Sequence, residues 1–304
     1  MSLREFLVLL LVCLCWGLHF IVMKVTVGDT ADPLFYAALR MSIVALFMLP
    51  WLKWHSGVMR LILGVGLGYG ALNYAFMFPA MGLTTASAAA ITIELYVPFS
   101  IILSVIVFKD KIGVYKTSGI LLAFAGVIII AAAKPDETAG PYFLWGILLM
   151  VGAAMSEAVG AVIVKLLKDV QPLQLLAWCA VIGSAVLWPL SFILEDNQLE
   201  AFAPENRKPF IMALIYSALI VSIVAHSSYY WLLQRLPIYV VSSTGLMTTV
   251  IAVIASALIL GEALTLNLLL GGLLTLGGIG LILARNNKAK QKTSNVPSQK
   301  PVIR

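Results

Sequence analysis

Long apolar runs recur along the whole chain and determine what it can fold into. A helix needs about 20 predominantly apolar residues to cross a bilayer, and short polar or Gly/Pro-containing breaks separate ten such runs. The predicted spans are 6–27, 33–52, 61–82, 86–108, 115–133, 142–165, 172–194, 209–234, 238–260 and 266–284. Of the 304 residues, 61% are hydrophobic and only 11% are charged, which excludes a water-soluble globule. The predicted fold class is an all-α polytopic membrane protein with ten transmembrane helices.

Positive charge is distributed unevenly between the two sides of this predicted bundle. If both termini share a side, that side carries 15 Lys/Arg and the other carries three. The fifteen are Arg4, Lys53, Arg60, Lys109, Lys111, Lys116, Lys165, Lys168, Arg235, Arg285, Lys288, Lys290, Lys292, Lys300 and Arg304, and the three are Lys134, Arg207 and Lys208. Cytoplasmic loops carry an excess of Lys and Arg, so we expect a multi-pass membrane protein with both termini in the cytoplasm. The net charge of +6 then reflects topology, and the expected partner is the lipid bilayer, not nucleic acid.

The sequence indicates neither a metal nor an organic cofactor. Cys13, Cys15 and Cys179 all lie inside apolar runs, which argues against a disulfide framework or a zinc site. The alternate glycines of Gly66-Leu-Gly-Tyr-Gly70 lie within a span without a preceding strand, so we interpret them as close helix packing and not as a dinucleotide loop or an ion filter. The N-terminus runs into the first span without a cleavage site and is expected to be a membrane helix.

The chain also repeats internally. An offset of 152 residues superposes three pairs: Asp110 on Glu262, Gly119 on Gly271, and Gly126 on Gly278. Each half holds five spans, an odd number, so the two halves must insert with opposite orientation, as in transporters with inverted repeats. The predicted units are a first repeat over 1–133, a second over 134–284, and a basic tail over 285–304 whose composition predicts disorder.

Six ionisable side chains fall inside predicted spans: His19, Lys24, Arg40, Glu94, Glu157 and His226. A charge at the centre of a membrane helix costs about 2.5–3.5 kcal/mol, so such residues usually face a cavity or one another. Lys24, Arg40 and Glu94 share the outer half of the membrane, and a static ion-pair cluster is the alternative to a functional role. Glu157 has no cation at its depth and is our first candidate for proton coupling. His19, His226 and Glu94 are further candidates, with hydrogen-bonded packing as the alternative for each histidine.

Pro98 and several aromatic side chains complete the candidate site. Proline clashes with the carbonyl four residues earlier, so Pro98 predicts a kink and a free carbonyl at Glu94, although a kink also serves packing alone. The predicted substrate cavity comprises Trp16, Phe20, Lys24, Arg40, Asn73, Glu94, Tyr229 and Tyr230. Core packing is the alternative explanation for its aromatic members.

These motifs together resemble a known family. Trp16-Gly17 followed by Lys24 is similar to the first-helix pattern of the drug/metabolite transporter superfamily, EamA type. Gly261-Glu262-Ala-Leu-Thr265 resembles the exit turn of its ninth helix, and the glycine pairs match the helices that follow. The resemblance covers residues 5–284. At Ser156-Glu157-Ala158 the second repeat departs from the Trp16 pattern, which implies a less symmetric cavity.

The resemblance implies two inverted five-helix repeats around a central cavity, with the fifth and tenth helices often at a homodimer surface. Bacterial members export amino acids and other small metabolites, often in exchange for protons. We therefore predict a secondary transporter of the bacterial inner (plasma) membrane and not an enzyme, exporting small amino acids or related metabolites by alternating access. The alternatives are an organic-anion or phosphorylated-metabolite exchanger and, from another class, a non-transporting membrane scaffold or enzyme subunit.

Overall fold

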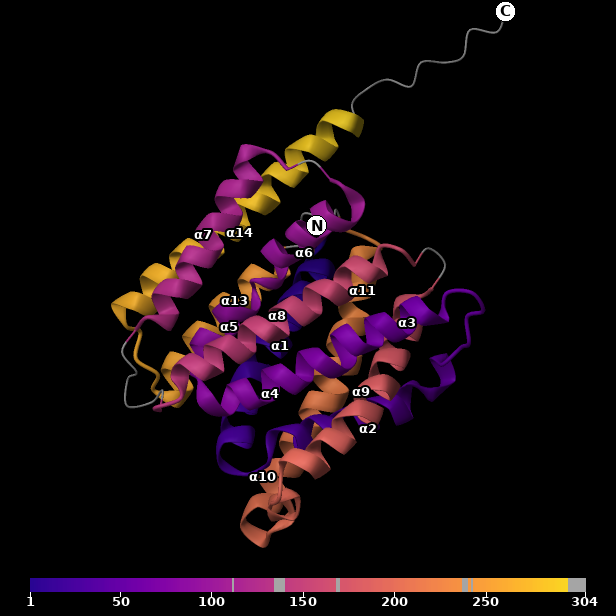
Figure 1. The fold of residues 1–304 in the computed structure, drawn as a ribbon, viewed down its shortest axis with the longest axis vertical. Coiled ribbons are helices and arrows are strands. Elements are labelled where there is room, and N and C mark those ends of the chain that lie inside the picture. Colours follow the sequence, from indigo (N-terminus) through magenta and orange to yellow (C-terminus); the bar gives the residue numbers. More distant parts are fainter. Residues whose placement is uncertain (111, 134–139, 168–169, 237–239, 242, 295–304) are drawn as a thin grey trace, which may run out of the picture.

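The structure is a computed structural model that describes residues 1–110, 112–133, 140–167, 170–236, 240–241 and 243–294. Several residues of the charge count therefore lie outside the described residues, namely Lys111, Lys134, Lys168, Lys300 and Arg304. The described residues form a bundle of helices (Figure 1). No strand occurs among them.

The first half of the chain forms five crossings. They are α1 (Leu3–Asp29); α2 (Pro33–Met48) with η1 (Leu49–Trp51); α3 (Met59–Val65), η2 (Gly66–Leu72) and α4 (Asn73–Leu83); α5 (Ala86–Ile93) and α6 (Tyr96–Phe108); and α7 (Val114–Ala131). The segment η2 is π-helical and continues α3 directly into α4. A capping box between Ser2 and Glu5 starts α1.

The second half repeats this order. It comprises α8 (Phe143–Val164); α9 (Pro172–Leu194); η3 (Gln198–Phe202); α10 (Pro204–Ile215), η4 (Tyr216–Ala225) and α11 (His226–Leu233); α13 (Thr244–Ala255) with η5 (Ser256–Leu260); and α14 (Leu266–Ser294). Pro33 and Pro172, which an offset of 139 superposes, both occupy the first turn of their helices, where the missing N–H costs nothing.

Among the described residues, nine helices are long and apolar enough to cross a membrane, and Thr244–Leu260 is a shorter apolar helix. The predicted class, an all-α polytopic membrane protein, is confirmed. Two predicted boundaries were wrong. The eighth crossing begins at Pro204 and not at 209, because proline is favoured in a first helical turn. The tail predicted to be disordered from 285 continues α14 to Ser294, since extending an existing helix through good helix formers such as Ala, Lys and Gln is inexpensive; residues 295–304 lie outside the described residues.

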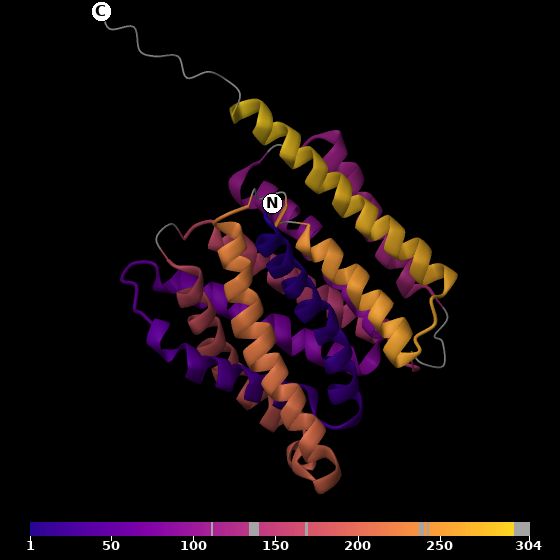
Figure 2. The same ribbon diagram turned by 180° about the vertical axis from the view of Figure 1, so that it is seen from behind.

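The helices α7 and α14 lie side by side at one edge of the bundle in both views (Figures 1 and 2). Gly119 packs against the backbone of Gly278, and Gly126 packs against that of Gly271. Because the contact partner moves backwards along α14 as the chain advances along α7, the two helices are antiparallel. Two helices related by the offset of 152 thus run in opposite directions, as inverted repeats require.

The same relation appears at the helix ends and in the helix contacts. Lys109 and Gly261, 152 residues apart, both have left-handed backbone conformations, with φ of 56° and 67°. The first helix of each half packs on the fourth crossing of the other half: α1 on α13, and α8 on α5 and α6. Figure 2 shows α1, in indigo, between the orange helices of residues 204–233 and 244–260. We call the end where α1 begins the terminal face and the other end the opposite face.

Candidate functional site

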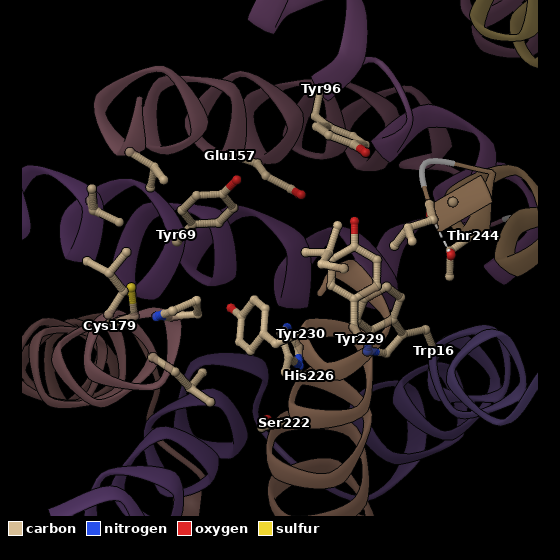
Figure 3. Close-up of a pocket in the computed structure, with 18 of the residues that line it drawn as sticks. Trp16, Tyr69, Tyr96, Glu157, Cys179, Ser222, His226, Tyr229, Tyr230 and Thr244 are labelled. Atoms are coloured by element: carbon tan, nitrogen blue, oxygen red, sulfur yellow. Dashed lines mark hydrogen bonds between the residues drawn. The ribbon is translucent and has the colours of Figure 1, made fainter. Parts of the chain in front are cut away.

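A cavity of about 620 Å³ lies among the helices of both repeats (Figure 3). Its polar and aromatic lining consists of Trp16, Tyr69, Tyr74, Glu94, Tyr96, Glu157, Cys179, Ser222, His226, Tyr229, Tyr230 and Thr244. The lining continues to Leu167 and Pro172 near the terminal face and, within the described part of the chain, includes no residue from the helix ends at the opposite face. The cavity therefore extends from the middle of the bundle toward the terminal face.

Glu157 contributes a half-buried carboxylate to this cavity from α8. In Figure 3 it points into the space between Tyr69 and Tyr96. Asn73, a buried residue of α4, donates from Nδ2 to Glu157 Oε2 at 3.4 Å and to the carbonyl of Ala153 at 3.0 Å. The amide that we expected to shape the pocket therefore lies behind it and holds the carboxylate.

Glu94 contributes the second carboxylate from a break between α5 and α6. The side chain is only 5% exposed, and its Oε1 accepts a hydrogen bond from the Thr249 hydroxyl at 2.9 Å. The helix is interrupted four residues before Pro98, where we expected the kink. The carbonyl of Glu94 is not free, however: it accepts from the Val97 N–H at 3.1 Å, because the chain tightens into a turn at the break.

Aromatic rings form one wall of the cavity. Trp16 contacts His226 and Tyr229, with ring centroids 5.2 Å apart in each case. His226 Nδ1 lies 2.9 Å from the carbonyl of Val221. Since a carbonyl only accepts, Nδ1 donates, and in the neutral ring Nε2 is then an acceptor. The hydroxyls of Tyr69, Tyr96, Tyr229 and Tyr230 make no hydrogen bond within the described part of the chain.

Besides Asn73 and the kink residue Pro98, four predicted site residues do not line the cavity. Phe20 lies in the hydrophobic core, and Lys24 donates to the carbonyl of Met81 at 3.1 Å. His19 is buried and is hydrogen-bonded to Ser217 Oγ at 2.8 Å. Phe20 and Lys24 share one face of α1 with Trp16, but they lie nearer the opposite face, where core side chains and not the cavity fill the bundle.

Arg40 is the fourth, and it is 2% exposed. It donates to the carbonyl of Ser217 at 3.3 Å and to Ser222 Oγ at 2.9 Å, and its guanidinium stacks 4.7 Å from the centre of the Tyr74 ring. Both accepting residues belong to the π-helical η4. Neither Arg40 nor Lys24 forms an ion pair with Glu94, so the static ion-pair cluster, which was the alternative to a functional role, does not form among these three described residues. Carbonyl, hydroxyl and aromatic groups stabilise the arginine instead.

Sequence reasoning missed Tyr69, Tyr74 and Tyr96. Tyr69 lies within the glycine run that we assigned to packing, and that assignment is correct for Gly66 and Gly70, which contact Ile182 and Cys179 of α9. The tyrosine between them faces the cavity from the π-helical η2. Tyr96 follows Glu94 by two residues, and its position beside a broken helix was the available signal.

Two carboxylates close the opposite face. Glu262 is 6% exposed and accepts from Ala86 N at 2.6 Å, Ser87 N at 3.0 Å and Ser87 Oγ at 2.6 Å, at the first turn of α5. Glu195 accepts from Leu34 N at 2.6 Å and Phe35 N at 2.8 Å, at the first turn of α2. Each acid of the second repeat thus caps a helix of the first, where the N–H groups and the helix dipole favour negative charge.

A polytopic helical bundle with inverted repeats and a cavity reaching one face is the architecture of a membrane transporter. The family model of the EamA-like transporter family matches residues 3–132 and again 144–284. The chain belongs to this family.

Its relatives carry transporter names. A protein of Salmonella typhimurium named probable amino-acid metabolite efflux pump is 28% identical over 287 residues, covering 92% of this chain and 94% of the relative. The Escherichia coli protein of the same name gives the same figures, and the transporter YoaV of Bacillus subtilis is 28% identical over 284 residues, covering 88% of this chain and 92% of the relative. A solved crystal structure superposes with a TM-score of 0.60 at 15% identity, covering 95% of this chain and all of the other, and supports the fold alone.

Proposed function

We propose that this protein is a secondary transporter that exports small amino acids or related metabolites across the bacterial inner membrane. The observation that carries the proposal is a cavity that reaches the terminal face while the carboxylates of buried Glu262 and half-buried Glu195 close the opposite face. Two relatives named amino-acid metabolite efflux pumps support the substrate class. The distribution of Lys and Arg supports a cytoplasmic terminal face.

Export by alternating access requires the closed face to open while the other closes. The caps by Glu262 and Glu195 are contacts between the two repeats, so a rocking of one repeat against the other breaks them and opens the opposite face. The carboxylate of Glu157, held by Asn73 beside Tyr69, Tyr96 and Glu94, is the proposed proton carrier. A homodimer through the outer faces of α7 and α14 remains a prediction of the family resemblance.

The organic-anion exchanger is less well supported. A phosphate or carboxylate ligand usually takes Arg or Lys partners, and among the described residues no Arg or Lys lines the cavity.

Flux measurements in liposomes test the proposed function. Purified protein is reconstituted, and labelled amino acids and amines are offered with and without an imposed proton gradient. We expect gradient-dependent flux of at least one of them. The absence of flux for every solute offered, with the protein folded, contradicts the proposal and favours the scaffold or enzyme-subunit alternative.

A reporter fused after Arg304 that is active only in the periplasm tests the orientation. It should be silent. Activity would place the terminal face outside the cytoplasm.

A further inference from the structure

The described lining of the cavity carries acidic side chains but no Lys or Arg. Glu94 and Glu157 are the acids among the described residues of its lining, so two carboxylates share one cavity. No described Lys or Arg lines the cavity to balance them. Arg40, in the neighbouring layer, is covered by Tyr74 and donates to Ser217 and Ser222, so these groups stabilise its charge without a carboxylate. Its buried Nη1 has no hydrogen-bond partner among the described residues. Bringing a further anion into this space adds repulsion with the carboxylates, whereas a cation relieves it.

The carboxylates that face the cavity are also only partly satisfied by hydrogen bonds. Glu94 accepts from Thr249 at Oε1, and no described residue donates to its Oε2, although the side chain as a whole is buried. Glu157 has one long hydrogen bond from Asn73. Buried carboxylate oxygens usually have donors, and an ammonium group offers three without an acceptor.

The aromatic wall suits the same ligand. Trp16, Tyr229 and Tyr230 lie on the side of the cavity formed by α1 and α11, and Tyr69 and Tyr96 lie beside Glu157 (Figure 3). Ring faces attract cations and pack against an apolar body. A cavity of about 620 Å³ is in the range of small-molecule sites, about 300–1,000 Å³.

We propose that the cavity recognises its cargo as an amine cation, with the ammonium group between Glu94 and Glu157 and the apolar body against the aromatic wall. The preferred ligands are amines that lack a free carboxylate, such as decarboxylated or esterified amino acids. A zwitterionic amino acid brings a carboxylate for which the described lining offers no cation. This inference rests on the proposed function only in taking the bound molecule to be the cargo.

Binding to the purified protein tests this recognition with four probes that share one side chain. They are phenethylamine, phenylalanine methyl ester, phenylalanine and 3-phenylpropionate. A ligand that binds only the native state raises its thermal stability. We expect both amines to raise it, with dissociation constants at least about tenfold below that of phenylalanine, and no effect of the anion. Phenylalanine or the anion binding as tightly as the amines overturns the inference, and so does the failure of both amines to bind.

Two variants and a control locate the site. Glu94→Gln and Glu157→Gln should each weaken phenethylamine binding by about tenfold or more, because each removes a charge-assisted contact. Glu205→Gln, at an exposed acid outside the cavity, should bind like wild type. Unchanged affinity in both cavity variants overturns the inference. If a variant folds poorly, the comparison of the four probes on the wild type still decides.

The flux and binding measurements distinguish failure of the amine inference from failure of the proposed function. Liposome flux of phenylalanine but not of phenethylamine overturns the amine inference and leaves the transporter proposal standing. Tight binding of phenethylamine without flux of any solute overturns the transporter proposal and leaves the inference about amine binding standing.

Discussion

Replacing Glu262 by glutamine should shift the equilibrium between the closed and the open state of the opposite face toward the open state. The carboxylate accepts three hydrogen bonds from Ala86 and Ser87 at 2.6 to 3.0 Å and is 6% exposed. Glutamine keeps one acceptor oxygen but directs an NH₂ group at a donor, and it removes the charge that faces the start of α5. A hydrogen bond to a charged group contributes about 1.5–3 kcal/mol, and the helix dipole adds about 0.3–1 kcal/mol. The expected loss is about 3 kcal/mol, which corresponds to roughly 100-fold in the equilibrium between closed and open.

Cysteine accessibility measures this shift. Ser256 is buried under the cap in contact with Ser87, so Ser256→Cys, in a background without Cys13, Cys15 and Cys179, serves as the reporter. A membrane-impermeant maleimide is added from the side of the opposite face. Labelling should be slow with Glu262 and roughly 100-fold faster with Glu262→Gln, in proportion to the open population.

The exposed Glu205→Gln provides the matched control and should label slowly. If Glu262→Gln lowers thermal stability but leaves the labelling rate of the Ser256→Cys reporter unchanged, the cap is a structural contact only and our account of the gate is refuted.

Three further predictions follow from other parts of the structure. Glu157→Gln should fold and retain weakened ligand binding, while its liposome flux no longer follows the proton gradient; flux that tracks the gradient like wild type would transfer the proton role to Glu94 or to His226. Burial raises the pKa of Glu195 above its ordinary 4.5, and the hydrogen bonds from Leu34 and Ser191 only partly offset this shift. The contribution of Glu195 to the free energy of unfolding is therefore present below pH 4.5 and is lost as the pH rises through the raised pKa. The melting temperature of wild type relative to Glu195→Gln should therefore fall with rising pH over that window, and a constant difference would refute this. A side chain at Gly126 meets the backbone of Gly271 in α14, so Gly126→Ala should destabilise the protein by about 1–3 kcal/mol, whereas Gly277→Ala, which has open space, should be neutral or slightly stabilising; equal melting temperatures for the two variants would contradict the packing.

The sequence predicted the helices far better than the cavity. Apolar length and the offset of 152 depend on composition and repetition, and both are visible along the chain, as the antiparallel contact of Gly119 with Gly278 shows. The partners of Arg40 were not predictable in this way. They are a carbonyl and a hydroxyl that the π-helical η4 presents from a distant segment, and helix periodicity carries no information about such local irregularity.

The aromatic residues illustrate the same limit. Trp16, Tyr229 and Tyr230 were predicted from their helical spacing and line the cavity, whereas Phe20, one turn beyond Trp16, lies in the core. Spacing identifies which residues share a helix face. The depth to which a cavity penetrates depends on how helices from the two repeats meet, and only the three-dimensional arrangement determines it.

Counterflow tests most directly the central claim that one cavity opens alternately to the two faces. Liposomes containing the protein are loaded with unlabelled phenethylamine at millimolar concentration and diluted into a trace of the labelled amine. The account predicts a transient accumulation of label above its equilibrium level, which is absent from empty liposomes and strongly reduced when Glu94 and Glu157 are both replaced by glutamine. Label that only equilibrates, without an overshoot, in liposomes that do conduct the amine would indicate a continuous pore and contradict the account.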